Sequence, residues 1–242
     1  MILARLTLAV AAVFAVLPAT DASAHTVCPL PVFGPGSQYH PRIKPSHFSS
    51  HVTNPWYPLK VGRTYVYTGT REGQAALDLV VTTSRTRVID GVRTRVVEDR
   101  LYLDNVLAER TSDYFAQDRC GNVWYFGEDT AELDAHGRVV SREGTFHAGV
   151  DGAQPGVVMQ AHPQLGRYFR QEWYAGQAED VFKVISLNAT FGRYHHALRT
   201  QETTALEPGV IDNKYYVRNI GEVAEIAVKG PTEALKLTEI IS

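Results

Sequence analysis

A group of acidic residues around a glycine-rich stretch is the part of this chain best suited to acid–base chemistry. The candidates are Asp151, Glu172, Glu179 and Asp180, with His147 as a possible base. Asp151 lies inside the glycine-rich stretch, residues 148–156, where a tight backbone path would bring its carboxylate close to a ligand. Neighbouring carboxyl groups shift each other's pKa values, which is how acid and base pairs arise. The set predicts a carboxylate-dependent hydrolase or lyase, unless these residues only end strands in solvent.

Other chemistries lack their usual sequence signatures. The chain contains no Gly-x-Ser-x-Gly or Ser-x-x-Lys motif for a serine nucleophile. The glycine-rich stretch does not end in Lys-Ser or Lys-Thr, and no His-x-His or His-Glu-x-x-His motif is present. Residues 118–122 contain oxygen ligands but lack the distal carboxylate of a calcium loop, so a hairpin turn is expected there. We therefore expect neither a metal nor a cofactor.

Aromatic residues indicate a second possible function, the binding of a small molecule. The candidates are Trp124, Tyr125, Trp173 and Tyr215. A curved sheet without covering helices has one face that must be closed by another segment or left open to a ligand. Small-molecule sites are lined mainly by apolar and aromatic side chains. The sequence thus favours a carrier of an apolar, lipid-like or envelope-derived ligand, while a filled core and a purely structural module remain open.

The first 24 residues have the pattern of a secretory signal peptide. Arg5 precedes an apolar run from Leu6 to Leu17, and Ala22-Ser-Ala24 supplies small residues for cleavage. The run is too short to span a membrane. We expect a soluble protein in the periplasm or outside the cell. Cleavage would leave His25 at the N-terminus, where a copper site of the histidine-brace type is conceivable, but the prolines that follow stiffen the chain and hold the next histidines apart.

The rest of the chain reads as an irregular arm followed by a β domain. Residues 25–60 contain seven of the twelve prolines, which exclude helix, and their aromatic residues should pack along the sheet. Residues 61–242 show runs of β-branched and aromatic residues separated by turns, with hairpins expected at 87–97, 101–110 and 113–126. No convincing amphipathic helix occurs. The fold class is mainly β, a single curved antiparallel sheet or open barrel.

Three segments carry a resemblance to known proteins. The run from Asn54 to Tyr67, which contains Pro-Leu-Lys-Val-Gly, resembles the opening strand of secreted bacterial proteins of the TapB-like kind. The run from Lys214 to Val223 resembles a strand near the end of those proteins. The block from Tyr114 to Asp180 is similar to uncharacterised secreted proteins that share Gly-Asn-Val-Trp-Tyr-Phe-Gly-Glu-Asp. The resemblance implies a curved antiparallel sheet and brings no established activity.

Cysteine count and charge complete the expectations. The only two cysteines are Cys28 and Cys120, and a secreted chain with an even number of cysteines is expected to join them in a disulfide. The formal net charge is −2, and the chain contains no run of basic residues. Nucleic acid is therefore not an expected partner.

Overall fold

Antiparallel strands dominate the computed structural model, which describes residues 29–242. The predicted signal peptide, His25 and Cys28 lie outside the described residues, so the cleavage, the copper question and the Cys28–Cys120 disulfide stay predictions. The described residues form two 3₁₀ turns, η1 (Gly36–Gln38) and η2 (Pro45–His47), and no α-helix. The strands are β1 (Phe48–Ser49), β2 (Thr64–Arg71), β3 (Gln74–Ile89), β4 (Val92–Leu103), β5 (Val106–Asp118), β6 (Val123–Leu133), β7 (Val139–Ser141), β8 (Phe146–His147), β9 (Gln154–Met159), β10 (Tyr168–Arg170), β11 (Glu172–Trp173), β12 (Asp180–Phe191), β13 (Tyr194–Thr204), β14 (Ile211–Val217), β15 (Gly221–Lys229) and β16 (Glu233–Ile241).

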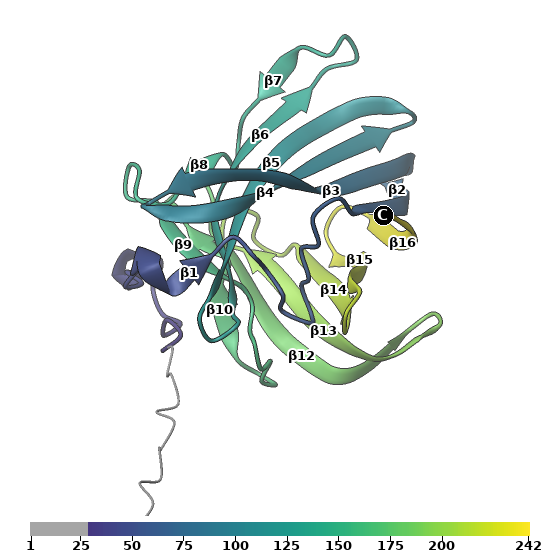
Figure 1. Cartoon of the computed structure of the whole chain (residues 1–242). Coiled ribbons are helices and arrows are strands. Elements are labelled where there is room, and N and C mark those ends of the chain that lie inside the picture. Colours follow the sequence, from purple (N-terminus) through teal and green to yellow (C-terminus); the bar gives the residue numbers. More distant parts are fainter. Residues whose placement is uncertain (1–28) are drawn as a thin grey trace, which may run out of the picture.

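The strands form one sheet that almost closes into a barrel. Their order is β10-β12-β13-β14-β15-β16-β2-β3-β4-β5-β6-β9-β11, with β1 beside β5 and with β7 and β8 beside β6. Strands β2–β6 form one wall in Figure 1 and strands β12–β16 form the opposite wall. Strands β10 and β11, separated only by Gln171, pair with β12 and β9 respectively. Residues 168–173, here called the closing segment, therefore join the two ends of the sheet. The predicted mainly-β fold, a curved sheet or open barrel, is confirmed.

The hairpins form where the turn residues predicted them. Asp90 and Gly91 connect β3 to β4 with φ values of 47° and 72°, and Asp104 and Asn105 connect β4 to β5 with φ values of 48° and 67°. Two successive residues with positive φ define the tight turn whose twist matches that of paired strands, and Asp, Asn and Gly adopt it most readily. Long strands joined by two-residue turns therefore build the wall from β3 to β5.

The glycine-rich stretch is shorter than the sequence indicates. Only residues 148–153 form a turn, because Gln154–Met159 is the almost wholly buried strand β9. Gly156 allows β9 to approach the closing segment, since a Cβ atom at this position would lie 2.3 Å from the carbonyl oxygen of Arg170. Residues 168–174 do not form one continuous strand, because the chain changes its pairing partner at Gln171.

The N-terminal arm packs on the sheet through its aromatic residues. Tyr39 and Trp56 are buried, and the ring of Phe48 meets those of Trp124 and Phe126 edge-on. The side-chain amide of Asn54 donates hydrogen bonds to the carbonyl oxygens of residues 121 and 160, at 2.8 and 3.0 Å. Burial of these rings offsets the entropy lost in ordering a proline-rich segment.

Candidate functional site

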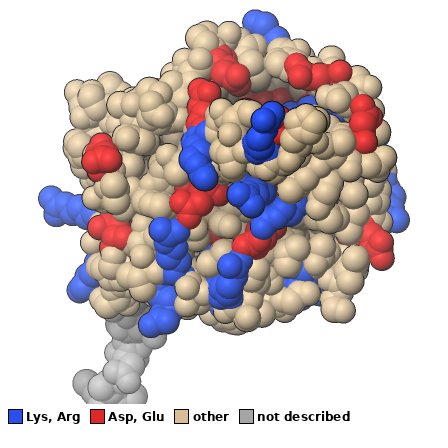
Figure 2. Space-filling model, turned by 90° about the horizontal axis from the view of Figure 1, so that it is seen from above, with Lys and Arg blue, Asp and Glu red and all other residues tan. Residues whose placement is uncertain are grey.

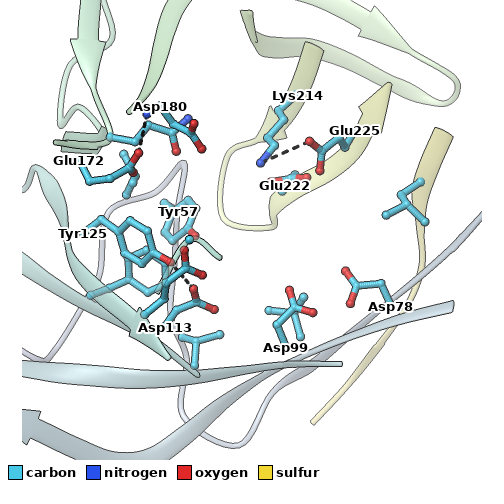
Figure 3. Close-up of a pocket in the computed structure, with 18 of the residues that line it drawn as sticks. Tyr57, Asp78, Asp99, Asp113, Tyr125, Glu172, Asp180, Lys214, Glu222 and Glu225 are labelled. Carbon is cyan, nitrogen blue, oxygen red and sulfur yellow. Dashed lines mark hydrogen bonds and ion pairs between the residues drawn. The ribbon is translucent and has the colours of Figure 1, made fainter. Parts of the chain in front are cut away.

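A cavity of about 760 Å³ lies between the two walls of the barrel. Side chains from β2–β6 line it on one side, and side chains from β12, β14 and β15 line it on the other. The segment at residues 57–59, the closing segment and several loop residues also contribute to its boundary. Figure 3 shows side chains from these separate elements pointing into one space. Its volume is within the range of small-molecule sites, which are about 300–1,000 Å³.

Three acidic residues enter the cavity from successive strands of the first wall. Asp78 lies on β3, Asp99 on β4 and Asp113 on β5. Side chains of a strand alternate between its two faces, so residues two positions away point in the same direction. Val80 and Phe115 stand in this relation to Asp78 and Asp113, and both also line the cavity. The acidic groups therefore occupy inward positions that are normally apolar.

The opposite wall carries a lysine among carboxylates. The Nζ atom of Lys214 on β14 lies 3.5 Å from Oε1 of Glu225 on β15, and these two residues are register partners. The same Nζ atom lies 3.3 Å from Oε2 of Glu202 on β13. Glu222 lines the cavity beside them (Figure 3). Because Lys214 sits between two carboxylates, its charge is already compensated.

Glu172 and Asp180 meet where the sheet closes. Oε1 of Glu172 accepts a hydrogen bond of 2.6 Å from the backbone N–H of Asp180. Glu172 is only 3 % exposed, and both residues line the cavity. Burial, followed by the charge of Asp180, holds the pKa of Glu172 well above its ordinary value. Of the residues proposed as catalytic from the sequence, these two are the pair that the fold brings together.

Burial and mutual repulsion favour the protonated form of several cavity carboxyls. Burial and the neighbouring Asp99 raise the pKa of Asp78 to about 10. Burial and the charge of Asp99 raise the pKa of Asp113 to about 7. Burial raises the pKa of Glu222 to about 8 and that of Glu225 to about 7, although Lys214 opposes both shifts. Several carboxyl groups of the cavity lining are therefore at least partly protonated near neutral pH.

Aromatic rings supply the apolar part of the cavity surface. The ring-bearing residues in its lining are Tyr57, Tyr65, Tyr67, Phe115, Tyr125 and Tyr216. Phe115 and Tyr125 are stacked with ring centroids 4.8 Å apart, and the Tyr125 hydroxyl donates a hydrogen bond of 2.5 Å to Oδ1 of Asp113. Aromatic faces thus stand directly beside carboxyl groups.

The other residues proposed as catalytic do not line this cavity. Asp151 is exposed in a turn, with a φ of 50°. The carboxylate of Glu179 accepts a hydrogen bond from the backbone N–H of Gly176. Nε2 of His147 lies 3.0 Å from Oδ1 of Asp129, away from the cavity lining. The sequence alone could not separate these three from Glu172 and Asp180, because all five are polar residues at strand ends or turns.

Of the four residues proposed as ligand-binding, only one lines this cavity. Tyr125 lines the cavity, whereas Trp173 packs against Gly36 and under the guanidinium of Arg170. Tyr215 packs against Phe191, with ring centroids 4.7 Å apart, and is absent from the cavity lining. Trp124 is 5 % exposed and borders a second hollow of about 490 Å³, formed mainly by the N-terminal arm.

Most cavity residues were missed by sequence reasoning. They include Asp78, Asp99, Asp113, Lys214, Glu222 and Glu225. The available signal was a charged residue on the same face of a predicted strand as an aromatic or apolar residue. Lys214 and Tyr216, two positions apart, are an example. That signal is weak, because an outward-facing charge in the same strand has similar neighbours.

Further observations bear on metals and on partners. Asp118 accepts hydrogen bonds from the backbone N–H groups of Cys120 and Asn122 and from Nε1 of Trp124, so its carboxylate stabilises a hairpin turn. Within residues 29–242, no three His, Cys, Asp or Glu side chains are grouped closely enough to hold a metal ion.

Basic and acidic side chains are interspersed on the face seen in Figure 2. In the same part of the chain, no helix has the length and apolar character needed to cross a membrane.

Comparisons with known proteins give no function. No protein-family model matches the chain, and no curated protein matches its sequence. One similar solved structure is a Bacteroides fragilis protein described as a "putative exported protein with YmcC-like fold". It is 9 % identical in sequence, with a TM-score of 0.44, and the match covers 78 % of this chain and 100 % of that protein. The resemblance to TapB-like proteins stays a prediction from the sequence.

Proposed function

We propose that this protein is a secreted binding protein that holds a small, partly apolar molecule inside its barrel. The observation that carries the proposal is the cavity of about 760 Å³, in which aromatic rings from separate strands gather around one space. Tyr57, Tyr67 and Tyr216 come from segments far apart in the sequence and line this same space. Secretion is supported by the signal-peptide pattern of residues 1–24. The ligand would be an apolar or envelope-derived small molecule.

Filling the cavity tests this proposal. N-phenyl-1-naphthylamine, an uncharged probe that fluoresces in apolar surroundings, is expected to bind to the purified protein. Val80→Trp places a large ring in the cavity from β3 and should abolish the fluorescence increase. Val88→Trp is the matched control, because Val88 lies on the same strand but is 60 % exposed. Binding that survives Val80→Trp as well as it survives Val88→Trp would contradict the proposal.

A carboxylate-dependent hydrolase or lyase is the second candidate. It is supported by the contact between Glu172 and Asp180, which line the cavity together. Turnover of a panel of nitrophenyl esters and glycosides would test it. Activity should be lost in Glu172→Gln and in Asp180→Asn, and kept in Asp151→Asn, since Asp151 lies outside the cavity lining. The absence of turnover of every substrate in the panel counts against this candidate.

A further inference from the structure

The cavity is lined by far more acidic groups than basic ones. Among the described residues in its lining, eleven are Asp or Glu and two are Lys or Arg. They come from both walls and from the closing segment, so the excess of carboxyls surrounds the space. Low-dielectric walls concentrate the field of such groups inside a cleft.

Both cations are already engaged by carboxylates. Lys214 lies 3.3 Å from Glu202 and 3.5 Å from Glu225. Arg71 lies 3.4 Å from Glu233 and 3.9 Å from Glu109. Among the described residues, Glu225 is the one lining carboxyl that takes part in an ion pair. The other ten have no ion-pair partner within residues 29–242.

Unpaired carboxyls in such a space are unfavourable without a compensating charge. Removing an ionised carboxylate from water is costly unless it is paired, and otherwise the group takes up a proton. Asp99 and Glu222 illustrate this, because each has a raised pKa, mainly through burial, and Asp99 contributes to the shift of Glu222 from the opposite wall. A cation placed between the walls would lower this cost.

Two cavity-lining groups also lack hydrogen-bond partners. Thr82 is 1 % exposed, and its Oγ1 atom has no partner among the described residues. Oδ1 of Asp78, on the same strand, is likewise buried and unpartnered. Buried polar groups are normally hydrogen-bonded, so these two atoms point to a polar group that enters from the cavity. Both residues belong to the cavity lining.

We propose that the ligand held in the barrel carries a positively charged nitrogen with N–H groups, as a protonated amphipathic amine does. Its cationic nitrogen lies among the carboxyls, and its apolar part packs against Tyr57, Tyr65 and Tyr67. Aromatic faces attract such cations, and groups of aromatic rings are a recurrent way to bind ammonium groups. An organic cation fits better than a bare metal ion, because the described acidic residues form no metal-binding group. The inference rests on the proposed binding function and names its ligand class.

A set of three probes with one fluorophore and different charges tests the inference. Dansylcadaverine ends in an ammonium group, N-pentyl dansylamide is uncharged, and dansyl-6-aminohexanoic acid ends in a carboxylate. Fluorescence titration of the purified protein should show the ammonium probe binding at least about tenfold more tightly than the uncharged one. The carboxylate probe should bind most weakly of the three.

Two double variants that remove the same formal charge test whether the cavity carboxyls cause the preference for the ammonium probe. Asp99→Asn with Glu222→Gln removes one carboxyl from each wall and should weaken the ammonium probe about tenfold more than the uncharged probe. The control, Asp151→Asn with Glu239→Gln, changes the formal charge equally at two exposed positions and should alter neither. Circular dichroism checks that both variants fold. If the cavity variant does not fold, the ranking of the probes on the unchanged protein decides the question.

The outcomes separate this inference from the proposed function. Equal or tighter binding of the uncharged or carboxylate probe overturns the inference and leaves the binding function standing. The same holds if N-phenyl-1-naphthylamine binds in the cavity while no dansyl probe binds. A failure of all four probes contradicts both proposals.

Discussion

The Oε1 atom of Glu172 accepts a hydrogen bond of 2.6 Å from the backbone N–H of Asp180, and this contact spans the place where the sheet closes. Glu172 belongs to β11 at one end of the strand order, and Asp180 begins β12, next to the other end. Gln171 adds a backbone hydrogen bond of 2.8 Å to the carbonyl oxygen of Asp180. The residues that close the barrel therefore also line its cavity.

Removing the Glu172 side chain should open this closure. Glu172→Ala removes the buried acceptor of the Asp180 N–H and is expected to lower the free energy of unfolding by about 1–3 kcal/mol. Glu172→Gln keeps an acceptor oxygen and resembles the protonated carboxyl that burial favours. This variant should therefore lower the free energy of unfolding by no more than about 1 kcal/mol. Urea denaturation of both variants measures the difference. Equal losses would show that the hydrogen bond does not stabilise the closure.

Stability should fall as pH rises. Carboxyls with pKa values of about 7 to 8 in the folded protein, such as Asp113 and Glu222, have ordinary values near 4 when unfolded. Between these values the folded state binds more protons than the unfolded state, so the free energy of unfolding decreases with pH. The midpoint of thermal unfolding should therefore be lower at pH 9 than at pH 5.

Asp113→Asn should reduce this pH dependence, because asparagine cannot ionise. At pH 9 the free energy of unfolding of this variant should exceed that of the unchanged protein by on the order of 2 kcal/mol, with little difference at pH 5. Asp151→Asn is the control, since Asp151 is exposed and lies outside the cavity lining. A pH profile that is unchanged in Asp113→Asn would mean that Asp113 does not retain its proton near neutral pH.

Lys214 should be required to stabilise the carboxylates around it. Lys214→Met leaves Glu202 and Glu225 unpaired and is expected to lower the free energy of unfolding at pH 8 by about 3 kcal/mol. Adding Glu225→Gln should restore part of this loss, because it removes one of the unpaired charges. Chemical denaturation measures both effects. Lys236→Met, at an exposed position, should change stability little, and an equal loss there would contradict the pairing argument.

Gly156 should tolerate no side chain. Gly156→Ala would place a Cβ atom 2.3 Å from the carbonyl oxygen of Arg170, so β9 or the closing segment must shift. The expected loss of stability is about 2 kcal/mol or more, typical of overpacking. Gly34→Ala is the control, because nothing lies within 4 Å of its added Cβ. Thermal unfolding compares the two variants, and similar midpoints would contradict the close approach.

The disulfide predicted from the sequence can be tested directly. If Cys28 and Cys120 are joined, alkylation of the denatured but unreduced protein should modify neither residue, and reduction should expose both. Mass spectrometry counts the modified thiols. Two alkylated cysteines before reduction would contradict the prediction.

The sequence by itself determined the fold class and the hairpins. These features depend on local requirements, such as the positive φ that Asp90 and Gly91 adopt between β3 and β4. Alternating apolar and polar residues likewise favour a strand wherever it lies in the fold. For this reason the mainly-β architecture could be predicted without knowing how the sheet closes.

Only the tertiary structure decided which face of each strand points inward. In β3, Asp78 lines the cavity, and its apolar neighbours Leu77 and Leu79 point to the opposite face, which reverses the usual pattern. Lys214 and Asp99 share one space although more than a hundred residues separate them in the sequence. Alternation distinguishes two faces of a strand but cannot say which of them a closed sheet encloses. That depends on the pairing of distant strands and on the partner change at Gln171, and for that reason the acidic cavity could not be predicted from the sequence.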